Sequence, residues 1–166
     1  MNDSLYEKNF AGWTEQQAAI LRELQHVPGL DVQHLVEELE ALGRRDVSDV
    51  RGLVRQAMAH MIKIAASPDA DAVHRWRDDA NTYVFDAQDQ YCAAYRRRID
   101  MNTLWKTAQV CARDELVLHG VTMLRLPYVC PIDLDWLLCE ESYQLDDACR
   151  IIKGEAGISS SGGAND

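Results

Sequence analysis

The chain has 166 residues, of which 47% are hydrophobic and 27% charged, an ordinary composition for one globular domain with a sizeable core. Its formal net charge of -10 argues against a general affinity for nucleic acid phosphates or anionic lipid. No apolar run approaches the roughly 20 residues of a membrane-spanning helix, and residues 1–4 show no feature of a signal peptide. We therefore expect a cytoplasmic protein without nucleic acid or membrane partners.

The cysteines agree with a reducing compartment. They are odd in number, widely spaced, and no pair shows the C-x-x-C spacing of a zinc or thioredoxin-like site. We expect free thiols, several of them packed as small hydrophobic side chains, rather than a disulfide framework. The five are Cys92, Cys111, Cys130, Cys139 and Cys149.

Two helix-start patterns lie close together near the N-terminus. Ser4 with Glu7, and Thr14 with Gln17, each fit a capping box, in which two side chains satisfy the end amides of a helix reciprocally. The pair predicts a short first helix and then a longer one that Thr14 caps. The second helix is expected to end near Val27-Pro28-Gly29, where proline and glycine form a stop signal.

The longest amphipathic stretch runs from Leu30 to Ser67 and is predicted to be the central helix of the fold. Apolar residues recur there at steps of three and four, which is the period of a helix with one buried face. We expect Asp31 to cap this helix, Gly43 to kink or divide it, and Pro68 to end it. The residues predicted to be buried along it are Leu39, Leu42, Leu53, Ala57, Met61 and Ile64.

Two further long helices are predicted beyond the central one. The first carries an apolar and aromatic stripe over residues 73–95, and the second covers residues 104–118 and closes with a glycine cap at Gly120. Prolines favour an extended crossing over residues 126–131. A short helix that contains Trp136 and is capped by Asp133 or Asp135 is expected next.

These elements together predict an all-α fold. We expect one domain over residues 1–153, a helical bundle of about five or six helices with a long central helix and an irregular C-terminal cap. Residues 154–166 are rich in serine and glycine, and this composition predicts a flexible tail.

Four pieces of sequence, in this order, resemble one family. They are LYEKNF with WTEQQ over residues 5–17, LVEELEALGR over 35–44, HMIK over 60–63, and Cys130-Pro131 with the leucines up to residue 138. The chain is similar over residues 5–143 to the bacterial family called Domain of Unknown Function 29. This resemblance implies an all-helical fold and no assigned chemistry. The chain differs from the family in carrying aspartates, not a basic segment, after Trp76.

Two pairs of potential metal ligands lie at helical spacing. His34 and Glu38 are four residues apart on one predicted helix, and Glu115 and His119 are four apart on another. Facing pairs of this kind could bind a divalent metal, and a metal-binding or hydrolytic bundle is therefore the alternative function. Each pair could instead interact locally on the surface, and neither has the Glu-x-x-His spacing of di-iron bundles. We therefore expect no cofactor, with a divalent metal as the alternative.

A small-ligand pocket is a further hypothesis. His60 lies close to the apolar face and has a pKa near neutrality, so it could be a general base or simply a core histidine. Trp76 and Tyr83 could line a pocket with it or belong to the core. Cys111 or Cys130 could supply a nucleophile, but neither neighbourhood is activating.

The charge pattern favours an interaction role. Arg44, Arg51 and Arg55 share one face of the central helix, and residues 133–147 are acidic and include Trp136. Both could be solvated faces, or they could dock on each other within one chain or between two. We therefore predict a non-catalytic protein-interaction module, with a protein partner or a homodimer.

Overall fold

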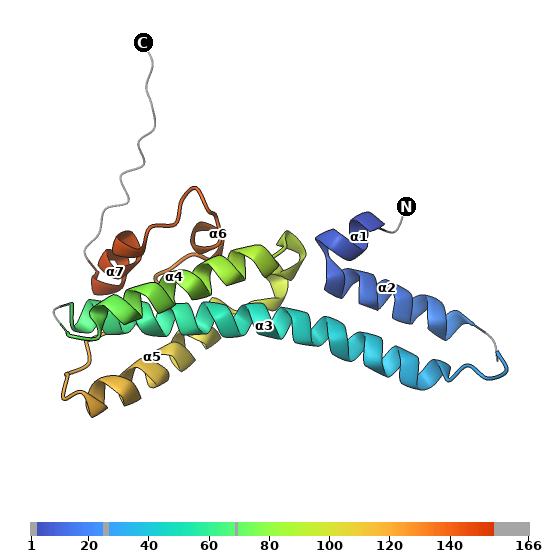
Figure 1. Cartoon of the computed structure of the whole chain (residues 1–166), viewed down its shortest axis with the longest axis horizontal. Coiled ribbons are helices and arrows are strands. Elements are labelled where there is room, and N and C mark those ends of the chain that lie inside the picture. The colour runs from blue at the N-terminus through green and yellow to red at the C-terminus, as the bar shows by residue number, and fades with distance from the viewer. Residues whose placement is uncertain (1–2, 25–26, 69, 155–166) are drawn as a thin grey trace, which may run out of the picture.

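The computed structural model describes residues 3–24, 27–68 and 70–154, and within these ranges it is helical without any strand. The predicted all-α fold around one long helix is confirmed (Figure 1). Of the expected C-terminal tail, residues 155–166 lie outside the described ranges. The elements are α1 (Asp3–Lys8), α2 (Phe10–Glu23), α3 (Val32–Ala66), α4 (Val73–Gln90), the 3-10 helix η1 (Ala93–Arg98), α5 (Met101–Leu118), α6 (Leu134–Leu137) and α7 (Leu145–Lys153).

Helix α3 runs through two differently built regions. Its 35 residues make it about 52 Å long at 1.5 Å per residue. Figure 1 shows α4, α5 and the C-terminal segment gathered around its second half, whereas α1 and α2 alone accompany its first half. We call residues 3–24 and 27–47, which contain α1, α2 and the first part of α3, the arm, and the rest of the described chain the body.

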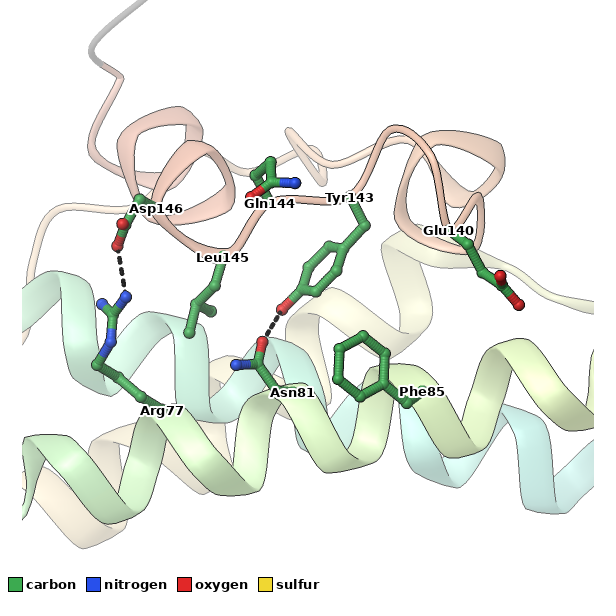
Figure 2. A pocket seen from close by; sticks show the side chains of 8 residues that line it. All are labelled: Arg77, Asn81, Phe85, Glu140, Tyr143, Gln144, Leu145 and Asp146. Atoms are coloured by element: carbon green, nitrogen blue, oxygen red, sulfur yellow. Dashed lines mark hydrogen bonds and ion pairs between the residues drawn. The ribbon is translucent and has the colours of Figure 1, made fainter.

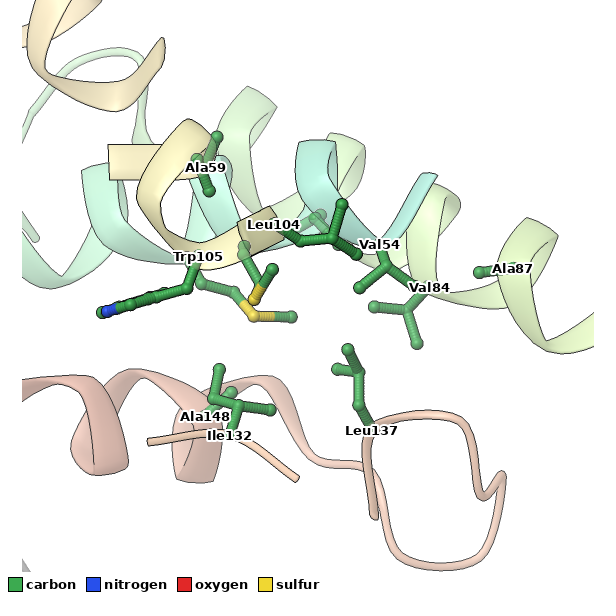
Figure 3. Packing of buried hydrophobic residues seen from close by; sticks show 14 of the residues in the cluster. Val54, Ala59, Val84, Ala87, Leu104, Trp105, Ile132, Leu137 and Ala148 are labelled. Carbon is green, nitrogen blue, oxygen red and sulfur yellow. The ribbon is translucent and has the colours of Figure 1, made fainter. Parts of the chain in front are cut away.

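The body has a closed hydrophobic core. Trp76 and Trp105 are buried, with exposed fractions of 1% and 0%. Figure 3 shows Ile132, Leu137 and Ala148 of the C-terminal segment packed beneath Trp105, Val54 and Val84. The indole N–H of Trp105 donates to the carbonyl of Pro127 at 2.9 Å, which fastens the extended crossing to α5. The expected irregular cap therefore contains two short helices, α6 and α7, and covers the core.

The arm is held together by small side chains. Ala11, Thr14 and Ala18 of α2 are buried against the first half of α3. A Cβ atom on Gly43 would lie 2.2 Å from the Thr14 hydroxyl, so the helices approach too closely for any larger residue there. The break into two helices expected at Gly43 is wrong, because α3 is continuous, and this glycine serves helix packing.

The start of α2 differs from the expectation. The helix begins at Phe10, and the side-chain oxygen of its cap, Asn9, accepts a hydrogen bond from the Gly12 N–H at 2.9 Å. Thr14 lies one turn inside the helix, and its buried hydroxyl donates to the Ala11 carbonyl at 2.8 Å. Thr14 is therefore not a cap, because a buried threonine can satisfy its hydroxyl on its own helix. Asp31 does cap α3, as predicted.

The predicted burial along α3 is confirmed for three residues of the body, is partial for Leu53 and Leu39, and is wrong for Leu42. Ala57, Met61 and Ile64 are buried, and Leu53 is partly buried. Leu42 is 40% exposed, and Leu39 is only partly buried. In the arm the buried row of α3 is displaced by one position from the predicted row, and it consists of Val36, Gly43 and Val47. The leucines lie on the neighbouring face.

Candidate functional sites

A buried ionic cluster joins the three long helices of the body. Lys63 of α3 is 2% exposed, and its Nζ lies 2.6 Å from Oε2 of Glu115 on α5. The same ammonium lies 5.2 Å from the centre of the Trp76 ring on α4. The Trp76 indole N–H donates to Oε1 of Glu115 at 3.3 Å. A buried charge is tolerated when it is paired and hydrogen-bonded in this way.

Glu115 provides the negative charge of this cluster. Burial by itself raises the pKa of its carboxyl, but the hydrogen bond and positive charge of Lys63 outweigh this, and the pKa lies below its ordinary value. The carboxylate is therefore ionised at neutral pH and compensates the ammonium. The arrangement links α3, α4 and α5 and keeps the amine away from solvent. Sequence reasoning missed Lys63, although a lysine inside the apolar run from Met61 to Ala66 is a detectable signal.

His60 lies one turn before Lys63. Its Nδ1 is 2.9 Å from the Gln56 carbonyl, and its Nε2 is 3.4 Å from Oδ2 of Asp79. Burial lowers the pKa of His60 below its ordinary value of 6.5, so the ring is neutral at neutral pH. The ring centres of His60 and Tyr83 are 5.4 Å apart, so the structure brings these two candidate residues together.

Trp76, the third candidate for a ligand pocket, faces a different cavity. The rings of Trp76 and His119 are 6.1 Å apart beside a hollow of about 540 Å³. This hollow lies where the loop after α3 meets the end of α5. Its lining is Ser67, Ala70, Asp71, Ala72, Trp76, His119 and Val121.

A second hollow lies between α4 and the C-terminal segment (Figure 2). It has a volume of about 340 Å³. The polar groups in it already bind each other: Arg77 is 2.8 Å from Asp146, and the Tyr143 hydroxyl donates to Asn81 at 3.0 Å. This hollow is therefore part of the packing contact between α4 and the C-terminal segment.

The two proposed metal-binding pairs are not brought together. His34 is exposed in the arm, where its Nδ1 lies 2.6 Å from Asp31, while Glu115 binds Lys63. Residues 34 and 63 are 29 positions apart on one continuous helix, or about 44 Å. His34 and Glu38 therefore cannot share an ion with Glu115 and His119. Within the described ranges, no three His, Cys, Asp or Glu side chains are grouped to hold a metal.

The cysteines are free thiols, as expected. Burial raises the pKa of Cys130 to about 11, so this candidate nucleophile is protonated at neutral pH. Burial raises the pKa of Cys149 to about 11 as well. Cys111, the other candidate, lies exposed on α5.

The acidic C-terminal segment docks within the chain, but on other arginines than expected. Asp135 is 2.9 Å from Arg96 of η1, and Asp146 is 2.8 Å from Arg77 of α4. Among the described residues Arg44, Arg51 and Arg55 form no ion pair with the segment, because its acidic side chains reach Arg77 of α4 and Arg96 of η1 while its apolar side chains pack on the second half of α3. Leu137 is buried, and Trp136 is partly buried with its ring 6.1 Å from that of Tyr143.

The arm carries a line of exposed or partly buried apolar side chains, two of which, Leu39 and Leu42, sequence reasoning assigned to the core. On α3 each of Leu35 and Leu42 directly precedes a buried residue; on α2 Trp13 precedes the buried Thr14, and Ile20 precedes the partly buried Leu21. Because α2 and α3 are antiparallel, residues that precede the buried positions by one lie on the same side of the arm. We call this surface the arm face, and it consists of Trp13, Ile20, Leu24, Leu35, Leu39 and Leu42.

Comparison with known proteins gives a family and a fold. A model of the family described as Domain of unknown function DUF29 matches residues 5–143. The chain is similar to an alpha-helical protein of unknown function from Rhodospirillum rubrum ATCC 11170, known from a crystal structure, with 28% identity and a TM-score of 0.80. That similarity covers 87% of this chain and 94% of the other. No curated protein matches the chain. In the described ranges, no helix is long and apolar enough to cross a bilayer.

Proposed function

We propose that this chain, which belongs to the family Domain of unknown function DUF29, is a cytoplasmic protein-interaction module that binds its partner through the arm face. One observation carries the proposal: four large apolar side chains of this surface retain 40–47% exposure in line on two adjacent helices. They are Ile20, Leu24, Leu35 and Leu42.

The grouping of these side chains matters more than their number. Single exposed apolar residues are normal on soluble proteins, but a contiguous patch costs solubility and commonly marks a binding surface. Covering apolar area contributes about 25 cal/mol per Å², so the four side chains provide a driving force for association. The absence of an assigned activity in the family and in the Rhodospirillum rubrum protein is compatible with a binding role.

The arm is built to present this face in a fixed orientation. The Tyr95 hydroxyl of η1 accepts from the Ala11 N–H at 3.4 Å and donates to the Asp46 carboxylate. Arg98 of η1 also pairs with Glu15 of α2. These contacts tie both helices of the arm to the body. A surface that is already ordered loses less entropy on binding.

The proposal is tested by photocross-linking in cells. A benzoylphenylalanine at position 35, on the arm face, is expected to yield covalent protein adducts. The matched control is position 117 on α5, where Val117 is 66% exposed but outside the arm. Adducts from position 35 and not from position 117 support the proposal. Equal adducts from both positions, or none from position 35, reject it.

A further inference from the structure

We infer that the partner of the arm face is the arm face of a second copy of this chain, with the two arms antiparallel in a four-helix bundle. This inference rests on the proposed function and names the partner of the same surface. It differs from the sequence-based expectation, which placed the contact on the acidic C-terminal segment. That segment is occupied within its own chain by Arg77 and Arg96.

The shape of the arm is that of half a four-helix bundle. Two antiparallel helices pack through one set of positions and present a second apolar row on one side of the pair. Four-helix bundles form when two such layers bury their apolar rows against each other. A contact between identical faces is self-complementary by symmetry, so the same row supplies both halves.

The charges along α3 specify a second copy in the antiparallel direction. Residues 31–40, towards the tip of the arm, contain four acidic residues and no lysine or arginine. Asp31 and Glu40 already pair with His34 and Arg22 of the same chain, whereas Glu37 and Glu38 form no ion pair among the described residues. Residues 44–55 contain four arginines and two aspartates, and one of these, Asp46, already binds Tyr95. None of the four arginines forms an ion pair with any residue that the structure describes. They are Arg44, Arg45, Arg51 and Arg55.

An antiparallel copy places the acidic tip of each arm beside the arginine-rich part of the other arm. A parallel copy would place the two acidic tips together and the two arginine-rich parts together, and like charges across an interface disfavour this arrangement. Glu38 and Arg45 are seven residues apart and lie on the same flank of the leucine row. A two-fold axis between Ala41 and Leu42 brings Glu38 of each chain to the level of Arg45 of the other. Leu39 and Leu42 then lie at the centre of the contact.

The same axis gives the tip of the arm a place to dock. Leu30 is 39% exposed at the tip, and the axis sets it at the level of Leu53 in the second copy. Leu53 and Gly52 line a shallow groove of about 400 Å³ on α3. Arg55 also lines this groove, and its Nε is buried without a hydrogen-bond partner among the described residues. The acidic tip of a second copy supplies carboxylate oxygens at this point.

Sedimentation equilibrium of the full chain tests the inference. The expected mass is twice 18.8 kDa, and the double variant Leu35→Glu/Leu42→Glu is expected to raise the dissociation constant of the dimer more than about tenfold. Both positions are already exposed, so circular dichroism should show unchanged helicity. The control Val117→Glu should leave the dimer intact. A monomeric wild type, or a dimer that tolerates the double variant, overturns the inference.

A charge exchange tests the direction of the arms. Glu38→Arg and Arg45→Glu are each expected to weaken the dimer about two- to fivefold, because exposed ion pairs are weak, whereas the two together should restore it. Failure of the combination to restore binding overturns the antiparallel arrangement. Failure of self-association can be distinguished from failure of the interaction module. If the chain is monomeric while position 35 cross-links to a protein of another mass, the interaction module stands and self-association is rejected.

Discussion

The arm and the body share helix α3, but other elements cover this helix to different extents in the two regions. In the body, eight of the nine residues from Ala57 to Ala65 of α3 are buried, because other elements surround that half of the helix. In the arm, α3 buries only Val36, Gly43 and Val47, and the leucine row beside them stays open. The contrast shows that apolar residues at helical spacing stabilise the fold in one region and remain available for binding in the other.

The largest expected effect separates the two regions by stability. Leu137→Ala in the body should cost about 2–5 kcal/mol, because this side chain is fully buried among α3, α4 and the C-terminal segment. Leu42→Ala in the arm should cost the monomer less than about 1 kcal/mol, because the side chain is 40% exposed in a single chain. Urea unfolding of both variants, at a protein concentration at which the chain is monomeric, measures the difference. Equal losses of stability would break the distinction between arm and body.

A smaller effect is expected where the arm is most tightly packed. Gly43→Ala should destabilise the chain by about 1–3 kcal/mol, because the new Cβ would lie 2.2 Å from the Thr14 hydroxyl oxygen. The matched control is Gly52→Ala on the same helix, where no atom lies within 4 Å of the new Cβ. That change should stabilise by up to about 1 kcal/mol, because alanine is the better helix former.

Thermal unfolding of both glycine variants, with Gly43→Ala/Thr14→Ala as a rescue, measures the packing of the arm. Removal of the Thr14 hydroxyl relieves the contact and should recover part of the loss. If Gly43→Ala and Gly52→Ala are equally stabilising, the close approach of α2 and α3 is wrong.

The smallest effect distinguishes two histidines by the sign of their pH dependence. His60 has a lowered pKa in the folded body, so its contribution to stability is present above pH 6.5 and is lost as the pH falls below that value. The hydrogen bond to Asp31 raises the pKa of His34 in the arm, so its contribution is present below pH 6.5 and is lost as the pH rises through the folded-state pKa.

Urea midpoints between pH 5 and pH 8 measure these contributions for His60→Gln and His34→Gln against the wild type. Relative to the wild type, His60→Gln should lose less stability on acidification, and His34→Gln should lose more. Parallel curves for all three proteins would contradict the burial of His60 and the pairing of His34.

The sequence predicted the elements of the fold better than their contacts. Helical period identified α3, α4 and α5, and side-chain chemistry identified the cap Asp31 and narrowed the cap of α6 to Asp133 or Asp135, because these features depend on neighbours in the chain. Period alone does not decide which of two adjacent apolar rows a second helix covers, and Leu39 and Leu42 were therefore assigned to the core.

The candidate sites were harder to predict from the sequence than the helices, because their geometry depends on tertiary contacts. His60 and Tyr83 of the proposed pocket lie close together, because they project from neighbouring helices, whereas Trp76 lines another hollow. Lys63 and Glu115 lie 2.6 Å apart in the body although they are 52 residues apart in the sequence. The partners of the acidic segment were likewise set by the path of the chain over α4 and η1. The charge pattern predicted that the acidic segment docks on arginines, but it did not distinguish among several candidate arginines.

Fluorine NMR of the full chain labelled with fluorotryptophan tests the central claim, that the arm face is a binding surface. The four tryptophans report separately, because Trp13 belongs to the arm face, Trp76 and Trp105 are buried in the body, and Trp136 lies under the C-terminal cap. On dilution, and in Leu35→Glu/Leu42→Glu, the account predicts a shift of the Trp13 resonance with the other three unchanged. A Trp13 resonance that is insensitive to both, or a common shift of all four, would contradict it.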